Sequence, residues 1–146
     1  MNQDARRNLE DLLDREIEAA RLLSTTLAAE RGALTGTAPE VVKEKAAEKI
    51  QLLETIERLE RERRAVCAES GLDDAPKVGG MVSERWRALM ELMAGCRAAN
   101  EVNGYIIHVR QNQVRQLMDI LRGATPVTYG PQGKTFARAL RALARA

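Results

Sequence analysis

The sequence predicts an all-α protein: an antiparallel three-helix bundle or coiled coil of long helices, followed by a flexible C-terminal segment carrying a short amphipathic helix. Apolar residues recur at steps of three and four along most of the chain. Charged residues make up 30% of the composition and aromatic residues only 3%, a balance typical of long helices and coiled coils. Links containing glycine and proline separate the periodic stretches, and short links make successive helices antiparallel.

The first predicted helix covers residues 4–31. Its apolar positions average near 3.6 residues apart, the period of a helix with one buried face. These positions are Leu9, Leu13, Ile17, Ala20, Leu23 and Leu27. The helix is expected to end near Gly32, with Gly36 in the link that follows.

The second predicted helix covers residues 38–69, and Ser70-Gly71 is expected to end it. The preceding Thr37-Ala-Pro-Glu40 has the form of a capping box, in which the Thr37 hydroxyl and the Glu40 carboxylate each accept from a backbone N–H. The charged stretch 57–64 is expected to be solvated on most sides. The apolar positions are Val42, Ala46, Ile50, Leu53, Ile56, Leu59 and Val66.

The third predicted helix covers residues 83–122 and is the candidate for the central helix, because it carries two adjoining apolar stripes. The first stripe contains Trp86, Met90, Met93, Asn100, Gly104, Ile107, Val114, Met118 and Leu121. The second contains Leu89, Leu92, Cys96, Ala99, Ile106 and Leu117. Two stripes indicate neighbours on more than one side, so residues 1–123 are expected to form one helical domain.

Asn100, Asn103 and Gly104 interrupt this helix with polar and small side chains. Glycine inside a helix costs about 1 kcal/mol relative to alanine, so some compensating role is expected. Polar residues that fix register and a glycine that admits a close neighbour would be sufficient; contact with a partner is the alternative.

Residues 124–146 form the predicted tail. Two prolines and two glycines between Ala124 and Gly133 prevent the helix from continuing. Beyond them, Thr135 to Arg145 places apolar residues at helical spacing among arginines, but it is too short to be stable alone. This segment therefore docks on the bundle, docks on a partner, or frays, and its apolar–basic alternation suits contact with a protein helix better than a polyanion.

Composition limits the partners and the compartment. The net charge of +2 favours neither nucleic acid nor a membrane surface. No apolar run is long enough for membrane insertion, and residues 2–15 are too charged for a signal peptide. Cys67 and Cys96 stand alone in helical patterns, as expected of buried, reduced thiols. A cytoplasmic protein is expected.

Residues suited to catalysis are scarce. Gly133-Lys134-Thr135 ends like a phosphate-binding loop, but Thr128 stands where that motif needs its first glycine, and a helix rather than a strand precedes it. His108 is the only histidine, and no metal-ligand spacing is present. The glutamates lie beside arginine and lysine at i,i+4 spacing, where ion pairing explains them. Neither an enzyme nor a cofactor or metal is expected.

Two motifs near the C-terminus resemble those of a known family. Residues 100–107 read Asn-Glu-Val-Asn-Gly-Tyr-Ile-Ile, a leucine-rich helix end closes at Leu121, and Thr128-Tyr-Gly-Pro-Gln-Gly133 follows. This combination resembles the C-terminal half of the FlgN family of flagellar export chaperones, with the match covering about residues 83–135. The tail beyond Gly133 departs from the family in being short and rich in arginine and alanine.

The resemblance implies a cytoplasmic chaperone that binds the C-terminal helices of hook-filament junction proteins, prevents their premature self-association and delivers them to the type III export gate. Carried over, the client-binding candidates are Val114, Leu117, Met118, Leu121, Phe136, Leu140 and Leu143. The candidates for contact with the export gate are Tyr129 and Gly130. Tyr129 has an equal alternative role, which is to pin its loop against the bundle.

Two other functions stay open. One is a structural coiled-coil adaptor that holds a homodimer together without a client; the sequence does not separate monomer from dimer. The other is weak binding of a polyanion through the arginines of the tail, which would depend steeply on salt.

Overall fold

The computed structural model describes residues 1–74 and 76–123, which three helices almost fill. α1 spans Gln3–Thr35, α2 spans Pro39–Glu69 and α3 spans Gly80–Leu121. The described residues contain no β-strand, and the all-α prediction is confirmed. The chain divides into two units, Met1–Ala99 and a second that begins at Asn100, so α3 contributes to both.

α1 is longer than predicted at both ends. Its N-cap is Asn2, whose Oδ1 accepts from the Ala5 N–H at 2.7 Å, so the first turn forms before residue 4. At the other end the helix continues through Gly32 to Thr35. Ala33 and Leu34 are buried there, and their burial offsets the roughly 1 kcal/mol that glycine costs inside a helix.

The predicted capping box before α2 is wrong. The N-cap is Ala38, which makes no side-chain cap, and Pro39 is the first helical residue. A residue that precedes proline is driven out of the helical region, and Ala38 accordingly has φ −123° and ψ 70°. Thr37 is therefore one position too early to be the cap.

α2 ends where the sequence predicts, in a Schellman motif. Leu72 N–H donates to the Cys67 carbonyl at 2.8 Å, and Gly71 N–H donates to the Ala68 carbonyl at 3.1 Å. Gly71 has φ 69°, a left-handed conformation that glycine adopts without a Cβ penalty.

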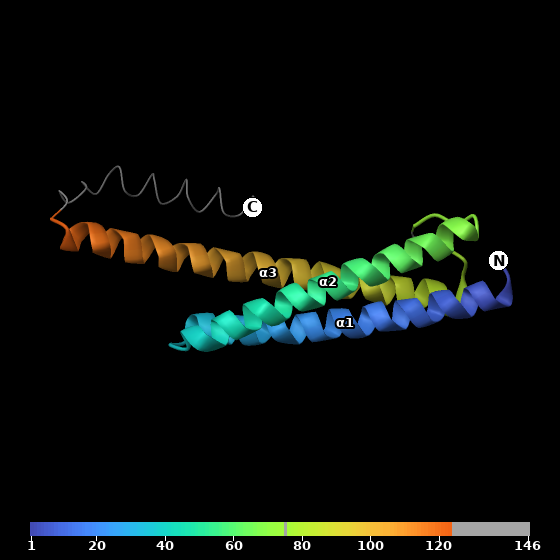
Figure 1. Cartoon of the computed structure of the whole chain (residues 1–146), viewed down its shortest axis with the longest axis horizontal. Coiled ribbons are helices and arrows are strands. Elements are labelled where there is room, and N and C mark those ends of the chain that lie inside the picture. Colours follow the sequence, from blue (N-terminus) through green and yellow to red (C-terminus); the bar gives the residue numbers. More distant parts are fainter. Residues whose placement is uncertain (75, 124–146) are drawn as a thin grey trace. The chain divides into compact units, whose positions relative to one another are not determined.

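α1 and α2 lie side by side in opposite directions (Figure 1). Two ion pairs between them define a constant register: Arg63 Nε to Glu16 Oε1 at 2.9 Å, and Lys49 Nζ to Glu30 Oε2 at 3.1 Å. The two glutamates, Glu16 and Glu30, are fourteen residues apart along α1. Their partners, Arg63 and Lys49, are also fourteen residues apart along α2, in the reverse direction. Fourteen residues are two heptads, the repeat of helices packed as a coiled coil.

The first part of α3, up to Ala99, packs on both other helices and runs parallel to α1. Arg85 Nε donates to Asp14 Oδ1 at 2.7 Å, and further along both helices Cys96 Sγ donates to the Ala20 carbonyl at 3.5 Å. This is the predicted up-down-up order. Met93 packs against both core clusters of the first unit, so the two stripes of α3 do meet different neighbours here.

The core of the first unit contains the predicted apolar face of α1 in full. One cluster comprises Leu12, Ala19, Leu23, Leu27, Ile56, Leu59 and Cys96. The other comprises Leu13, Ile17, Ala20, Val82 and Leu89. The predicted stripe of α2 is only partly buried, because Ile50 and Leu53 are exposed.

The expectation that the charged stretch 57–64 is solvated fails at Arg63, which is buried together with Glu16. Arg63 also donates to the Asp74 carbonyl, and its guanidinium lies 4.6 Å from the centre of the Trp86 ring. The elements α1, α2, α3 and the link after α2 thus converge on one buried cation. Exposed pairs at i,i+4 spacing occur as predicted, Arg58 with Glu62 among them.

Candidate partner-binding surface

Two columns of residues, each with a spacing of seven, run along α3 and define a coiled-coil seam. One column is Trp86, Met93, Asn100, Ile107, Val114 and Leu121. The other is Val82, Leu89, Cys96, Asn103, Arg110 and Leu117. Such a seam is the surface that a helix presents to neighbouring helices.

Burial along the second column changes abruptly. Its first four members, from Val82 to Asn103, are no more than 3% exposed. The fifth position is the exposed Arg110, and the sixth, Leu117, is 60% exposed. The apolar pattern therefore continues along the helix after its burial has stopped.

The exposed apolar residues of this last stretch form a surface that we call the α3 end patch. It consists of Val114, Leu117, Met118, Ile120 and Leu121. Every residue from 113 to 121 is exposed, and Leu121 is 74% exposed. Contiguous exposed apolar side chains of this kind mark interaction surfaces.

Four of the predicted client-binding residues, Val114, Leu117, Met118 and Leu121, lie in the α3 end patch. The sequence prediction missed Ile120, which is 67% exposed, because it lies outside both stripes. The other predicted site residues lie outside the described residues: Phe136, Leu140, Leu143, Tyr129 and Gly130.

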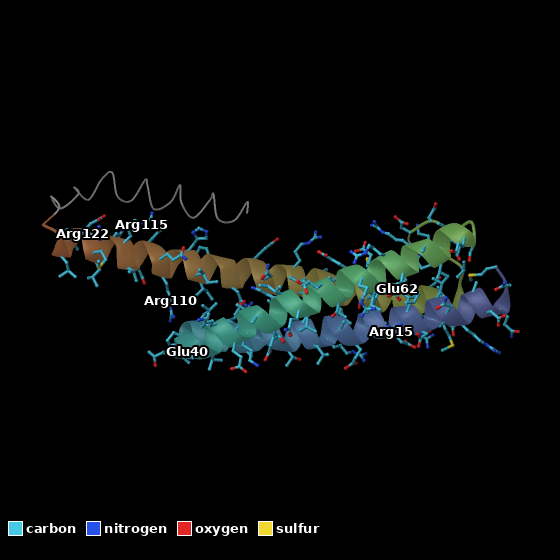
Figure 2. The ribbon with its side chains drawn as sticks, in the orientation of Figure 1. Arg15, Glu40, Glu62, Arg110, Arg115 and Arg122 are labelled. Carbon is cyan, nitrogen blue, oxygen red and sulfur yellow. The ribbon has the colours of Figure 1, made fainter. Side chains whose placement is uncertain are left out.

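Charges around the patch are uneven. Arg115 and Arg122 precede and follow Met118 by three and four residues, so both neighbour it on the helix surface. Figure 2 labels them together with Arg110. On the other edge, Ile120 has Gln116 and Gly123 at the equivalent spacings. One edge of the patch carries these two arginines with Asp119 between them, a net charge of +1, and the other edge is neutral.

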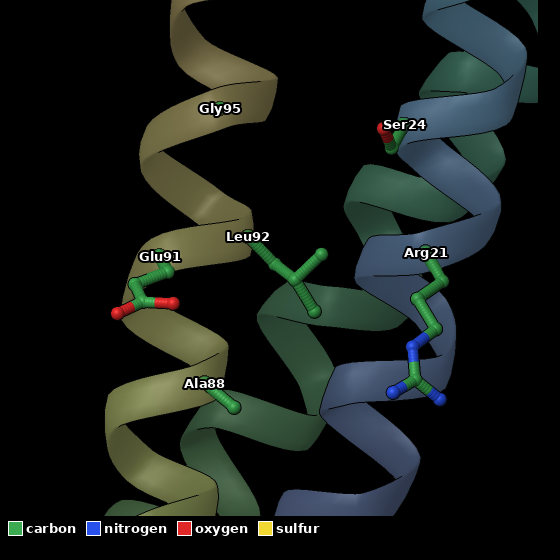
Figure 3. Close-up of a pocket in the computed structure, with 6 residues that line it drawn as sticks. All are labelled: Arg21, Ser24, Ala88, Glu91, Leu92 and Gly95. Carbon is green, nitrogen blue, oxygen red and sulfur yellow. The ribbon is translucent and has the colours of Figure 1, made fainter.

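Within the first unit, a surface groove of about 340 Å³ lies between α1 and α3 (Figure 3). Arg21 and Ser24 line it from α1, and Leu92 points toward α1 from the other side. The remaining lining residues are Ala88, Glu91 and Gly95. Ser24 has no histidine beside it in this lining, so the groove offers no paired nucleophile and base.

The described residues contain no group of three histidine, cysteine, aspartate or glutamate side chains placed to hold a metal ion. Both cysteines are buried and free, and burial raises the pKa of the Cys67 and Cys96 thiols above the ordinary value of 9.0. A high pKa keeps a thiol in its unreactive, protonated form. Over the part of the chain that the structure describes, no helix has the length and apolar character of a membrane span.

Three long helices, the first two in coiled-coil register, define a class: all-α proteins built as helical bundles. Comparison with known proteins identifies the family. The family model described as FlgN protein matches residues 1–136. The "Flagella synthesis protein FlgN" of Salmonella typhimurium (strain LT2) is 28% identical over 135 residues, covering 87% of this chain and 89% of that protein.

The protein of the same name from Salmonella typhi matches with the same identity and coverage. No solved structure matches the chain. The chain belongs to the FlgN family, and the resemblance noted in its C-terminal half extends over the N-terminal helices as well. Leu140 and Leu143 lie beyond the residues that the family model matches.

Proposed function

We propose that this chain, which has a role in flagellar assembly, is an export chaperone for the hook-associated proteins at the hook-filament junction. It binds their C-terminal helical segments in the cytoplasm, prevents premature self-association and delivers them to the type III export gate. The family membership supports the flagellar role. The observation that carries the chaperone function is the α3 end patch.

The patch suits a client helix because it extends a seam of seven-residue spacing. Leu117 belongs to the column whose first four members are buried, and Val114 and Leu121 belong to the neighbouring column. A client helix laid along these residues would repeat the packing that α3 makes in the first unit. Met118 adds an adaptable apolar side chain that accommodates more than one client.

Direct binding tests this proposal. The full chain is titrated with purified C-terminal segments of hook-filament junction proteins, and affinity is followed by fluorescence anisotropy. Leu117→Asp with Leu121→Asp removes two apolar contacts of about 1.5 kcal/mol each. Affinity should therefore fall about 100-fold.

Ile50→Asp is the matched control, since Ile50 is an equally exposed apolar residue on α2. It should leave client affinity unchanged. Equal loss of affinity in Ile50→Asp and in the double variant would move the binding site away from the α3 end patch. Failure of the wild-type chain to bind any junction segment would refute the chaperone function.

The tail, residues 124–146, is proposed as a second, separate region that contacts clients and the export gate. Leu140→Asp with Leu143→Asp is expected to abolish client binding and to leave the melting temperature nearly unchanged. A large drop in melting temperature would show that the tail belongs to the folded core instead.

Tyr129 and Gly130 are the proposed contacts to the export gate, since a tyrosine in a turn can anchor a protein interface. Tyr129→Ala should leave client affinity intact and reduce client secretion. Loss of thermal stability without loss of secretion would assign Tyr129 to packing of its loop.

The competing function is a structural coiled-coil adaptor that forms a homodimer without a client. Light scattering separates the two. A dimer that persists at low concentration and binds no junction segment would establish the adaptor, whereas a one-to-one complex with a segment would establish the chaperone.

A further inference from the structure

Building on the proposed function, we propose that the α3 end patch selects acidic clients: the docked helix carries carboxylates along one side of its apolar stripe, and they pair with Arg115 and Arg122. The family assignment names a flagellar role, whereas this inference adds a chemical selection rule. It is drawn from the arrangement of charge beside the exposed apolar residues.

Arg115 and Arg122 are seven residues apart, so they lie on the same side of α3, one repeat after the other. Both are exposed, and neither forms an ion pair with a carboxylate among residues 1–74 and 76–123. Some exposed arginines elsewhere in these residues do form such pairs, for example Arg15 with Asp11 and Arg64 with Glu60. The two cations beside the patch are thus available to a partner.

The local charge favours an anion. Residues 110–123 contain three arginines and one acidic residue, Asp119, giving a net charge of +2. Asp119 stands four residues after Arg115 and three before Arg122, but no ion pair with either is present. A client helix with glutamates or aspartates seven residues apart would match the spacing of the arginines.

Two nearer occupants fit less well. The chain's own tail contains Lys134, Arg138, Arg141 and Arg145, and no acidic residue follows Asp119 in the sequence. Laid against the patch, it would set cation against cation. A second copy that docked through its own α3 end patch would likewise bring its arginines toward Arg115 and Arg122. Charge therefore selects a different, acidic chain.

The test uses the full chain and the junction-protein segments as probes. Arg115→Gln with Arg122→Gln removes both charges and keeps helix propensity nearly constant. Arg61→Gln with Arg87→Gln is the control, because these arginines are also exposed and form no ion pair in the structure. Affinities are measured at about 50 and about 500 mM salt, which changes screening severalfold.

Loss of two exposed ion pairs predicts that the affinity of the Arg115/Arg122 variant falls about five-fold at low salt. That variant should also lose most of the salt dependence, while the control behaves like wild type. A segment whose carboxylates are replaced by amides should bind the wild type and the variant equally. This last comparison assigns the effect to client carboxylates.

Unchanged affinity and salt dependence in the Arg115/Arg122 variant, with the wild type still binding segments, would overturn the selection rule and leave the chaperone function standing. Absence of binding by the wild type would remove the proposed function and this inference together. A change in oligomeric state in the variant, without a change in segment affinity, would overturn the inference in favour of contact between copies.

Discussion

The buried arginine of α2 provides the sharpest test of how the bundle is held together. Arg63→Met keeps most of the side-chain volume and removes the charge. The substitution abolishes the 2.9 Å bond to Glu16, the bond to the Asp74 carbonyl and the contact 4.6 Å from the Trp86 ring. It leaves the Glu16 carboxylate buried without its cation.

Breaking a buried pair by removing one partner costs about 3–5 kcal/mol, because the remaining charge loses its compensation. The free energies of the bond to the Asp74 carbonyl and of the cation–π contact are not added to this cost, because contacts of one side chain are not independent. A protein of this size has a total stability of roughly 5–15 kcal/mol, so Arg63→Met should lower the melting temperature by about 10 °C. Thermal unfolding followed by circular dichroism measures the shift.

The matched control is Arg58→Met on the same helix. Arg58 pairs with Glu62 at 2.9 Å, but both side chains are about half exposed. Exposed pairs contribute about 0.2–1 kcal/mol, so the control should shift the melting temperature by no more than about 3 °C. Equal shifts in the two variants would refute the view that burial makes the Arg63 pair decisive.

The pH dependence follows from Glu16. Burial raises the pKa of its carboxyl above the ordinary value of 4.5, and the neighbouring Arg63 charge opposes that rise. A group whose folded pKa is raised binds its proton more tightly in the folded state. Its stabilising contribution is complete below pH 4.5 and is lost as pH rises through the folded pKa.

Removing Arg63 raises the pKa of the Glu16 carboxyl further, because the opposing charge is gone. The deficit of Arg63→Met should therefore be largest near neutral pH and shrink toward pH 4.5. A second variant, Arg63→Met with Glu16→Leu, removes both charges and should recover most of the lost stability. A deficit that is independent of pH and not recovered in this variant would assign the loss to packing.

The remaining predictions concern glycines and thiols. Gly71→Ala should cost about 1 kcal/mol, because Gly71 has φ 69° and only the backbone opposes a side chain there. Gly104→Ala should stabilise the chain by about 1 kcal/mol, since an added Cβ meets no atom of the described residues within 4 Å. Urea unfolding measures both changes in stability. Loss of stability in Gly104→Ala would show that the glycine has a packing role. Cys67 and Cys96 should react slowly with a thiol reagent at pH 8 in the native chain and quickly in urea. The reason is that burial raises the pKa of both thiols. Fast labelling of the native chain would contradict their burial.

The helical architecture was predictable because periodicity reports directly on burial. All six apolar positions predicted for α1 are buried, from Leu9 to Leu27. The capping box failed for a local reason, since a single proline moved the start of α2 by one residue. The pattern of α2 overestimated burial at Ile50 and Leu53, because periodicity identifies a face but not how far a neighbour covers it.

The buried ion pairs were not predicted, although the sequence contains their signal. Arg63 follows Ile56 and Leu59 at helical spacing and therefore lies on the buried face of α2. Glu16 and Glu30 occupy buried positions of α1 in the same way. From one helix alone, a charged residue on an apolar face is interpreted as a solvated break in that face. The buried ion pair becomes evident only when the register with the second helix is known, because that register places the opposite charge beside it.

At Gly104 the sequence predicts a packing role that the structure does not show. The sequence predicts that this glycine admits a close neighbour, with contact with a partner as the alternative. Among the described residues, nothing lies within 4 Å of an added Cβ, so a close neighbour does not explain the glycine. The helix carries an avoidable cost of about 1 kcal/mol at this position, which leaves contact with a partner as the testable role.

The proposed function assigns folding and binding to different residues of α3. The first unit satisfies its polar groups internally: no buried side-chain nitrogen or oxygen among the described residues lacks a hydrogen-bond partner. The α3 end patch contributes little to that unit's stability, because Leu117 and Leu121 keep most of their surface in solvent. Substitutions in the patch should therefore change affinity without changing melting temperature, and substitutions at Arg63 should do the reverse. A chaperone that releases its client needs this separation, since a surface that stabilised the free chain would have to unfold before a client could bind.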